Sequence, residues 1–153
     1  NFNTYPAVYR GILNFFGDIW TFIRDVVIVN RNANYNSIYL LKKGVNHADI
    51  TIDNIQDKCY LIGEQANTNN FITEFDFRFG PYFIPNKVGT NKKADYNWIR
   101  GNNGQDTDKA VRVLLLGGSA TSGSGAGSGG FHSLWVRSGS DATVGFFTTV
   151  KLD

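Results

Sequence analysis

The sequence predicts an α+β domain, and three observations support that fold class. A stretch near the N-terminus has the three- and four-residue apolar spacing of an amphipathic helix. Several later stretches are short, rich in β-branched and aromatic residues, and separated by Asn, Gly and Asp, as strands and turns are. With 42% hydrophobic and 18% charged residues, the 153-residue chain has the balance of a globular protein with a substantial core. We therefore expect residues 1–153 to form a single domain, with one or two helices packed on short mixed or antiparallel sheets and long organised loops.

The predicted helix spans Arg10 to Arg24. Residues that recur every three or four positions share one face of a helix, and the apolar residues here are Ile12, Phe15, Phe16, Ile19, Trp20 and Ile23. Gly17 inside this segment costs a helix about 1 kcal/mol relative to Ala. We expect another backbone segment to pack closely at that position.

Three apolar runs, "DVVIVNR", "SIYLLK" and "KCYLIG", follow the predicted helix and are expected to be strands. The segment Phe71 to Gly80 alternates between apolar and charged residues. Its buried face is expected to carry Phe71, Phe75, Phe77 and Phe79, and its wet face Glu74, Asp76 and Arg78. Two more strands are predicted from "AVRVLLLGG" and "ATVGFFTTVKL".

The stretch Gly117 to Phe131, "GGSATSGSGAGSGGF", has the composition of a flexible linker but lies between two predicted strands. Only about twenty residues follow it, too few to bury a separate core. The glycines therefore belong to a loop inside the fold. Loops held by a rigid scaffold are where proteins commonly place recognition.

Charge and composition exclude several function classes. The 15 basic and 13 acidic residues are scattered, so we expect no nucleic-acid partner. No apolar run approaches the roughly 18 to 20 residues of a membrane helix, so no membrane insertion is expected. The single cysteine, Cys59, permits no internal disulfide and is expected to be buried. Because the chain has no Met and begins at Asn1, we expect it to be the C-terminal part of a longer protein.

The sequence offers little for metal, cofactor or catalytic chemistry. One side of a predicted strand carries His47, Asp49, Thr51 and Asp53, but nothing nearby converges on them, so a solvated face is expected rather than a metal site. His132 and Ser133 are adjacent and would point to opposite faces of a strand, so they cannot act together as base and nucleophile. "GSGAGSGG" lacks the Lys-Ser/Thr of a phosphate-binding loop. We expect no metal, no cofactor and no enzyme activity.

An ordered series of short motifs runs through the chain: Tyr9-Arg10-Gly11 with Gly17 to Trp20, Phe83-Ile84-Pro85, Asp95-Tyr96, Gly117-Gly118, Ala126-Gly127 and Gly145-Phe146. This series resembles phage tail and virion proteins with a C-type-lectin fold. It is similar to the branch related to formylglycine-generating enzyme, which includes receptor-binding proteins diversified by retroelements. The chain departs from the family pattern at Ala94, Ala120 and Phe147. The related oxidase activity needs active-site cysteines, and Cys59 lies outside the matching C-terminal region.

The resemblance implies a C-type-lectin-like domain with a ligand-binding surface in its C-terminal segment. The side chains that it implies point outward are Thr121, Ser122, Ser124, Ser128, His132, Ser133, Trp135, Arg137, Ser138 and Asp141. Trp135 beside Arg137 has the composition of a binding hot spot. The alternative for Trp135 is a place in the core, because either face of its predicted strand could point inward.

The resulting expectation is a non-enzymatic receptor-binding or adhesin domain on a bacteriophage particle, which recognises a host surface protein or glycan. Its location would be the virion, in a tail or head fibre, or alternatively the bacterial cell surface. Other virion proteins are expected partners, and a homo-oligomer such as a trimer would multiply affinity through effective concentration. The alternative function is a structural virion module, for head decoration or fibre joining, whose Gly/Ser-rich segment packs between subunits.

Overall fold

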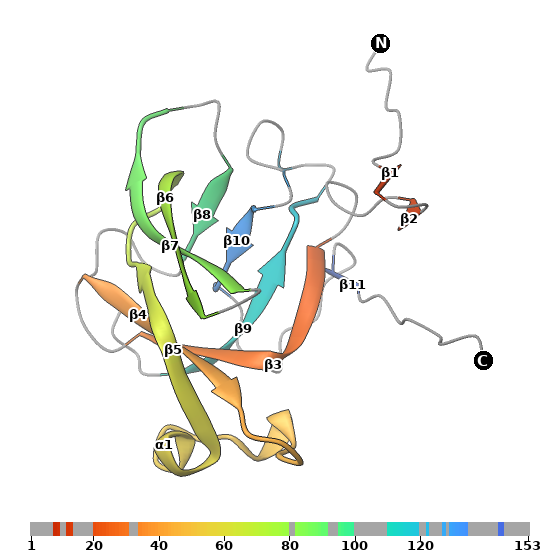
Figure 1. Cartoon of the computed structure of the whole chain (residues 1–153), viewed down its shortest axis with the longest axis vertical. Coiled ribbons are helices and arrows are strands. Elements are labelled where there is room, and N and C mark those ends of the chain that lie inside the picture. Colours follow the sequence, from red (N-terminus) through yellow and green to blue (C-terminus); the bar gives the residue numbers. More distant parts are fainter. Residues whose placement is uncertain are drawn as a thin grey trace.

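The computed structural model describes residues 8–9, 12–13, 20–30, 34–79, 82–91, 95–99, 110–119, 122, 127, 129–134 and 144–145. Within them the protein is nearly all β: eight strands of one mixed sheet follow one another around a nearly closed barrel (Figure 1). The helical turns of the described part are η1 (His47–Asp49) and α1 (Ile55–Lys58). No helix described by the structure has the length and apolar character needed to cross a bilayer.

Neighbouring strands pair in an order that differs from their order in the chain. Along the barrel that order is β5 (Cys59–Ala66), β4 (Tyr35–Leu41), β3 (Trp20–Asn30), β9 (Val111–Leu116), β10 (Phe131–His132), β8 (Tyr96–Trp98), β6 (Asn70–Phe79) and β7 (Tyr82–Gly89). The pairs along this path are antiparallel except β10 with β8, which is parallel. Three short strands complete the description: β11 (Val144–Gly145), parallel to β3, and the separate hairpin of β1 (Val8–Tyr9) and β2 (Ile12–Leu13).

The barrel is closed by packing between β5 and β7, the first and last strands of the order. Gly63 on β5 lies against Ile84 on β7, and a Cβ at Gly63 would come within 2.6 Å of Ile84 Cδ1. Real Cβ atoms essentially never approach so closely, so a larger residue at position 63 would make the Ile84 side chain move. Glycine lets Ile84 pack directly against the backbone of β5.

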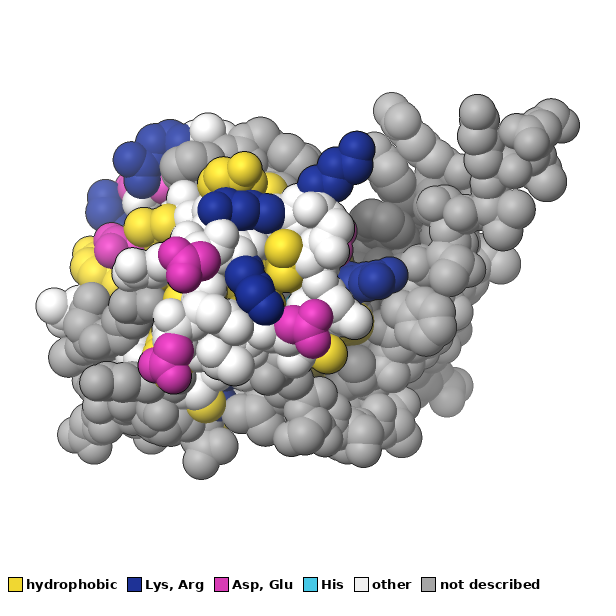
Figure 2. Space-filling model, turned by 90° about the horizontal axis from the view of Figure 1, so that it is seen from below, with side chains coloured by type: hydrophobic (Ala, Val, Ile, Leu, Met, Phe, Trp, Pro, Cys, Tyr) yellow, Lys and Arg dark blue, Asp and Glu magenta, His cyan; other side chains and the backbone are white. Residues whose placement is uncertain are grey.

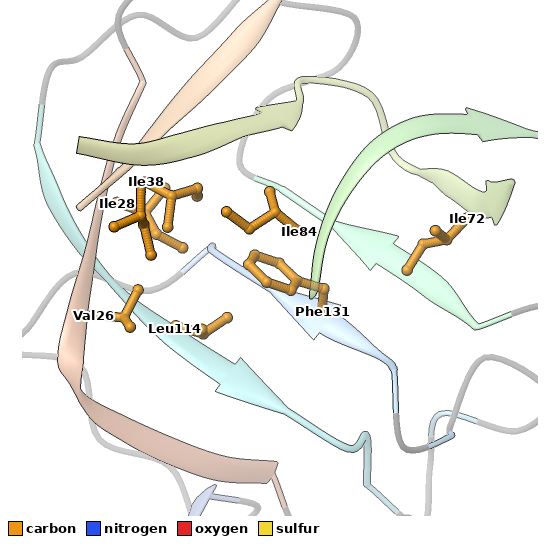
Figure 3. Packing of buried hydrophobic residues seen from close by; sticks show 8 residues of the cluster. Val26, Ile28, Ile38, Ile72, Ile84, Leu114 and Phe131 are labelled. Atoms are coloured by element: carbon orange, nitrogen blue, oxygen red, sulfur yellow. The ribbon is translucent and has the colours of Figure 1, made fainter. Parts of the chain in front are cut away.

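The main core fills the inside of the barrel. Side chains from β3, β4, β7, β9 and β10 converge there (Figure 3), and the buried cluster comprises Val26, Ile28, Ile38, Ile62, Ile72, Ile84, Leu114 and Phe131. A second cluster lies on the other face of β3, β4 and β5 under η1 and α1, and includes Val27, Val29, Tyr39, Ile50, Ile55 and Cys59. Both faces of β3 are therefore covered. Full burial of each such aliphatic side chain contributes about 1.5–3 kcal/mol.

The predicted helix at Arg10 to Arg24, and with it the α+β C-type-lectin-like fold, is wrong. Trp20 to Arg24 begins β3, and Ile12–Leu13 forms β2. The β3–β9 register shifts between Ile23 and Val27, around the exposed Arg24 and Asp25. Such an irregularity changes which residues share a face, so the strand does not show a two-residue alternation. Thr21, Phe22 and Ile23 are residue types that favour strands over helices.

Most of the predicted strands are confirmed. The runs "DVVIVN", "SIYLL", "CYLIG" and "VRVLLL" lie in β3, β4, β5 and β9, respectively, and Cys59 is buried. The strand predicted around His47 is wrong, because His47–Asp49 forms a 3-10 turn and Ile52 to Asn54 forms another turn. An Asn46 side chain that accepts a hydrogen bond from Ala48 N, at 3.0 Å, starts the first of these turns.

The alternation predicted for Phe71 to Gly80 is wrong in both halves of the strand. Ile72, on the face predicted to be solvated, is buried in the main core, and farther along Phe77 is 65% exposed whereas Asp76 is buried. The β6–β7 pairing has three register irregularities, the last between Asp76 and Phe79, and each one resets the two-residue period. Arg78 compensates the buried carboxylate with hydrogen bonds of 2.9 Å from Nε and 2.6 Å from Nη2, which hold the pKa of Asp76 below its usual value.

Candidate binding site

The glycine-rich stretch connects two neighbouring strands of the barrel. Leu116 at the end of β9 pairs with Phe131 at the start of β10, in antiparallel register. The expectation that this stretch is a loop inside the fold is therefore confirmed. The connection leaves β9 through Gly117 and Gly118, which have φ values of 95° and 81°. Residues with side chains rarely adopt this left-handed region, so glycine makes the exit from β9 possible.

Backbone hydrogen bonds tie the described parts of the loop to one another. Gly117 N donates to Gly130 O at 3.0 Å, Gly127 N to Gly117 O at 3.2 Å, and Gly130 N to Gly127 O at 3.0 Å. A turn also forms near the first strand, where Ser122 N donates to Ser119 O at 2.9 Å. Ser119 N in return donates to Ser122 Oγ at 3.0 Å. These bonds fix the base of the loop.

Asp95, just before β8, anchors the returning side of the loop. Its Oδ2 accepts a hydrogen bond of 2.9 Å from Gly129 N. A Cβ at Gly127 or Gly129 would collide with the Asp95 carboxylate, and one at Gly129 would also meet Phe75 Cζ at 2.9 Å. Glycine at these two positions lets the backbone reach the carboxylate, and a hydrogen bond to a charged acceptor is stronger than a neutral one.

His132 follows the loop on β10 and is buried in an aromatic cage. Its ring centroid lies 4.8 Å from that of Trp20 and 6.3 Å from that of Trp98. Leu134 N donates to His132 Nδ1 at 3.4 Å, which requires an unprotonated Nδ1. Burial lowers the pKa of His132 from 6.5 to about 4, so the ring is neutral at pH 7.

Ser133 belongs to a polar network that crosses the inside of the barrel. Its Oγ donates to Gln65 Oε1 at 2.8 Å, and the same Gln65 oxygen accepts a hydrogen bond of 3.1 Å from Asn36 Nδ2. Gln65 Nε2 donates to Asn97 Oδ1 at 2.6 Å. Because Gln65, Asn97 and Ser133 are fully buried, the network fixes the end of β10 to β4, β5 and β8.

The structure describes three of the ten side chains predicted to face a ligand. Ser122 is half-buried in the loop turn, while His132 and Ser133 are 6% and 0% exposed. The two buried residues therefore lack the outward orientation that the resemblance implies. The other seven lie outside the described residues: Thr121, Ser124, Ser128, Trp135, Arg137, Ser138 and Asp141.

The anchoring residues Asp95, Gln65 and Asn97 were missed in the sequence. Asp95 follows two lysines and an alanine and resembles part of a solvated loop. A signal was present for Gln65 and Asn97, since amide side chains inside otherwise apolar strands are expected to find buried partners. Their partners are 29 to 68 positions away in sequence. Local sequence patterns therefore do not identify which residues these partners are.

The chemistry of the described residues is that of hydrogen bonding and packing. Among them, no three His, Cys, Asp or Glu side chains come close enough to hold a metal ion. On the face seen in Figure 2, Lys and Arg are interspersed with Asp, Glu and apolar residues. That mixture gives the face no field of a single sign.

Comparisons with protein-family models, with curated proteins and with solved structures find no match to this chain.

Proposed function

We propose that the chain is a non-enzymatic binding domain that recognises a protein or glycan on a host cell from the surface of a bacteriophage particle. The glycine-rich loop and the segment after it form the recognising surface. The scaffold of this surface is the nearly closed β-barrel and not a C-type-lectin fold. Its sequence support is the ordered motif series and the pairing of Trp135 with Arg137, two residue types enriched at binding hot spots.

The anchoring of the loop is the observation that carries this proposal. Gly129 is held by Asp95, Gly117 by Gly130, and the strands on both sides are paired. A loop fixed in this way loses less conformational entropy on binding than a free linker, which raises affinity for the same contacts. In this arrangement His132 and Ser133 lie beneath the surface and position it, and Thr121, Ser124, Ser128, Trp135, Arg137, Ser138 and Asp141 are proposed to contact the ligand.

A structural virion module is the second candidate, and a specific observation favours it. Tyr60, Leu61 and Phe77 are large apolar side chains with 58%, 55% and 65% of their surface exposed. In a virion module a neighbouring subunit would cover these side chains. In this alternative the domain joins other virion proteins or further copies of itself.

Cell binding by the isolated domain tests the first candidate. The Trp135→Ala/Arg137→Ala variant is expected to bind bacterial cells at least about tenfold more weakly than the parent, a loss of about 1.4 kcal/mol. The matched control is Tyr60→Ala/Lys43→Ala, which also removes one aromatic ring and one cation, and it is expected to bind normally. Urea unfolding verifies that both variants are folded. Equal binding by the parent and the Trp135→Ala/Arg137→Ala variant refutes the assigned surface.

A further inference from the structure

A second surface feature lies where the ends of β5 and β7 meet, at the opposite end of β3 from the glycine-rich loop (Figure 1). It is an open depression of about 630 Å³, within the range of roughly 300–1,000 Å³ that is common for small-molecule sites. Its polar and amphipathic lining includes Asn34, Tyr35, Thr68, Thr73, Asn86 and Lys87. We call it the polar depression.

Asn34, just before β4, and the turn between β5 and β6 form one side of the polar depression. They are joined by a hydrogen bond of 2.8 Å from Asn67 N to Asn34 O. The turn is also held from inside the barrel, because Asn97 Nδ2 donates to Thr68 O at 2.9 Å. These contacts hold Asn34 and Thr68 in place before any ligand arrives.

The β6–β7 hairpin forms the other side, and Glu74 fixes its side chains. Glu74 Oε2 lies 2.7 Å from Lys87 Nζ, across the strand pair. Asn86 also hydrogen-bonds to Glu74, and these two contacts, that of Lys87 first, lower the pKa of Glu74. Asn86 Oδ1 is buried and has no hydrogen-bond partner among the described residues. A ligand in the open depression cannot reach this oxygen, so an ordered water is expected to satisfy it.

The lining favours an uncharged ligand with many hydroxyl groups. Asn and Thr side chains both donate and accept hydrogen bonds, as sugar hydroxyls do. Tyr35 lines the depression and is 39% exposed, and an aromatic ring is the kind of group that packs on the apolar face of a sugar. The charge of Lys87 is balanced by Glu74, whose side chain is itself 47% exposed. A cationic ligand would meet the Lys87 ammonium, and an anionic ligand would have to displace the Glu74 carboxylate from Lys87.

We propose that the polar depression binds a neutral oligosaccharide. Tyr35 provides the stacking surface, and the amide and hydroxyl groups of Asn34, Thr68 and Thr73 bind the sugar hydroxyls. This site is separate from the glycine-rich loop and does not depend on the function proposed for that loop.

Amide chemical shifts of the whole chain test this assignment. The probes are neutral trisaccharides built from glucose, galactose, mannose, xylose or N-acetylglucosamine, with trigalacturonic acid as the charged comparison and an extended tetrapeptide as the peptide comparison. At least one neutral trisaccharide is expected to shift the amides of Asn34, Tyr35, Thr68 and Lys87. Tyr35→Ala should weaken this binding about tenfold, a loss of about 1.4 kcal/mol.

Two control variants distinguish binding at the polar depression from binding elsewhere on the surface. Tyr60→Ala removes another exposed tyrosine, and Lys43→Ala removes an exposed cation that does not line the polar depression, so both are expected to leave trisaccharide binding unchanged. The assignment is overturned if no neutral sugar shifts these amides, or if Tyr60→Ala weakens binding as much as Tyr35→Ala does. It is also overturned if only the charged sugar or the peptide binds at the polar depression.

Discussion

Lowering the pH from 7 to 5 should destabilise the barrel through His132. The ring is enclosed by Trp20 and Trp98, and burial lowers its pKa from 6.5 to about 4. In the unfolded chain the ring is expected to take up a proton near pH 6.5, whereas the folded chain resists protonation down to about pH 4. The contribution of the neutral ring is therefore fully present above pH 6.5 and is lost as the pH falls toward 4.

The size of this effect follows from the two pKa values. The free energy of unfolding is expected to decrease by about 2 kcal/mol between pH 7 and pH 5, and by about 3 kcal/mol over the whole window. The interval above pH 5 isolates the histidine from Glu74 and Asp76, because their hydrogen bonds to Lys87 and Arg78 keep their pKa values below the ordinary range of carboxylates.

Urea unfolding at pH 7, 6 and 5 measures the effect, and His132→Phe provides the comparison. Phenylalanine retains an aromatic ring between the two tryptophans but cannot bind a proton. The pH-dependent loss should therefore be absent from His132→Phe over this interval. The reasoning is refuted if the variant loses as much stability as the parent, or if a chemical-shift titration shows that the folded His132 ring becomes protonated near pH 6.5.

Three further predictions concern the buried network, the loop anchor and the thiol. Gln65→Leu removes hydrogen bonds to Asn36, Asn97 and Ser133, and each buried polar atom left without this bond costs about 1–3 kcal/mol. Its free energy of unfolding should therefore fall further than that of Ser133→Ala. Equal decreases for the two variants would contradict the network. Gly129→Ala places a methyl group against the Asp95 carboxylate and should cost about 1–3 kcal/mol in urea unfolding, whereas an unchanged midpoint would exclude this contact. Burial raises the pKa of the Cys59 thiol, so iodoacetamide should modify it at least about tenfold more slowly in native than in unfolded protein; equal rates would show that it is accessible.

The sequence predicted well those strands whose side chains are buried on both faces, because their burial does not depend on the pairing register. In "DVVIVN" and "VRVLLL" nearly every side chain is buried whichever face it occupies, so the continuous apolar run is sufficient. Cys59 was predicted to be buried for the same reason, since a lone thiol beside apolar neighbours behaves as a small hydrophobic residue.

The errors occur where register irregularities and distant contacts decide the structure. Around Ile23 and around Phe77 a shift in strand pairing resets the alternation, and neither shift has a local signature. Arg78 permits Asp76 to be buried while Phe77 is exposed. His132 and Ser133 were expected on the surface because the motif resemblance implies an outward-facing C-terminal segment, but Gln65 and the two tryptophans enclose them.

The loop was predicted from composition and from position between strands. What the sequence lacked was the anchor, because Asp95 lies 34 positions from Gly129. The contact of Asp95 with Gly127 and Gly129 can be predicted only once β8 and β10 are known to be neighbours.

Native-state hydrogen exchange at the glycine-rich loop tests the central claim most directly. The amides of Gly117, Gly129 and Gly130 donate hydrogen bonds, so they should exchange at least about a hundredfold more slowly than in an unstructured peptide. Asp95→Ala should remove the protection of Gly129 while the amides of β4 remain protected. Exchange of all three glycines at unstructured rates in a folded parent protein would contradict the claim that this stretch is a fixed connection rather than a linker.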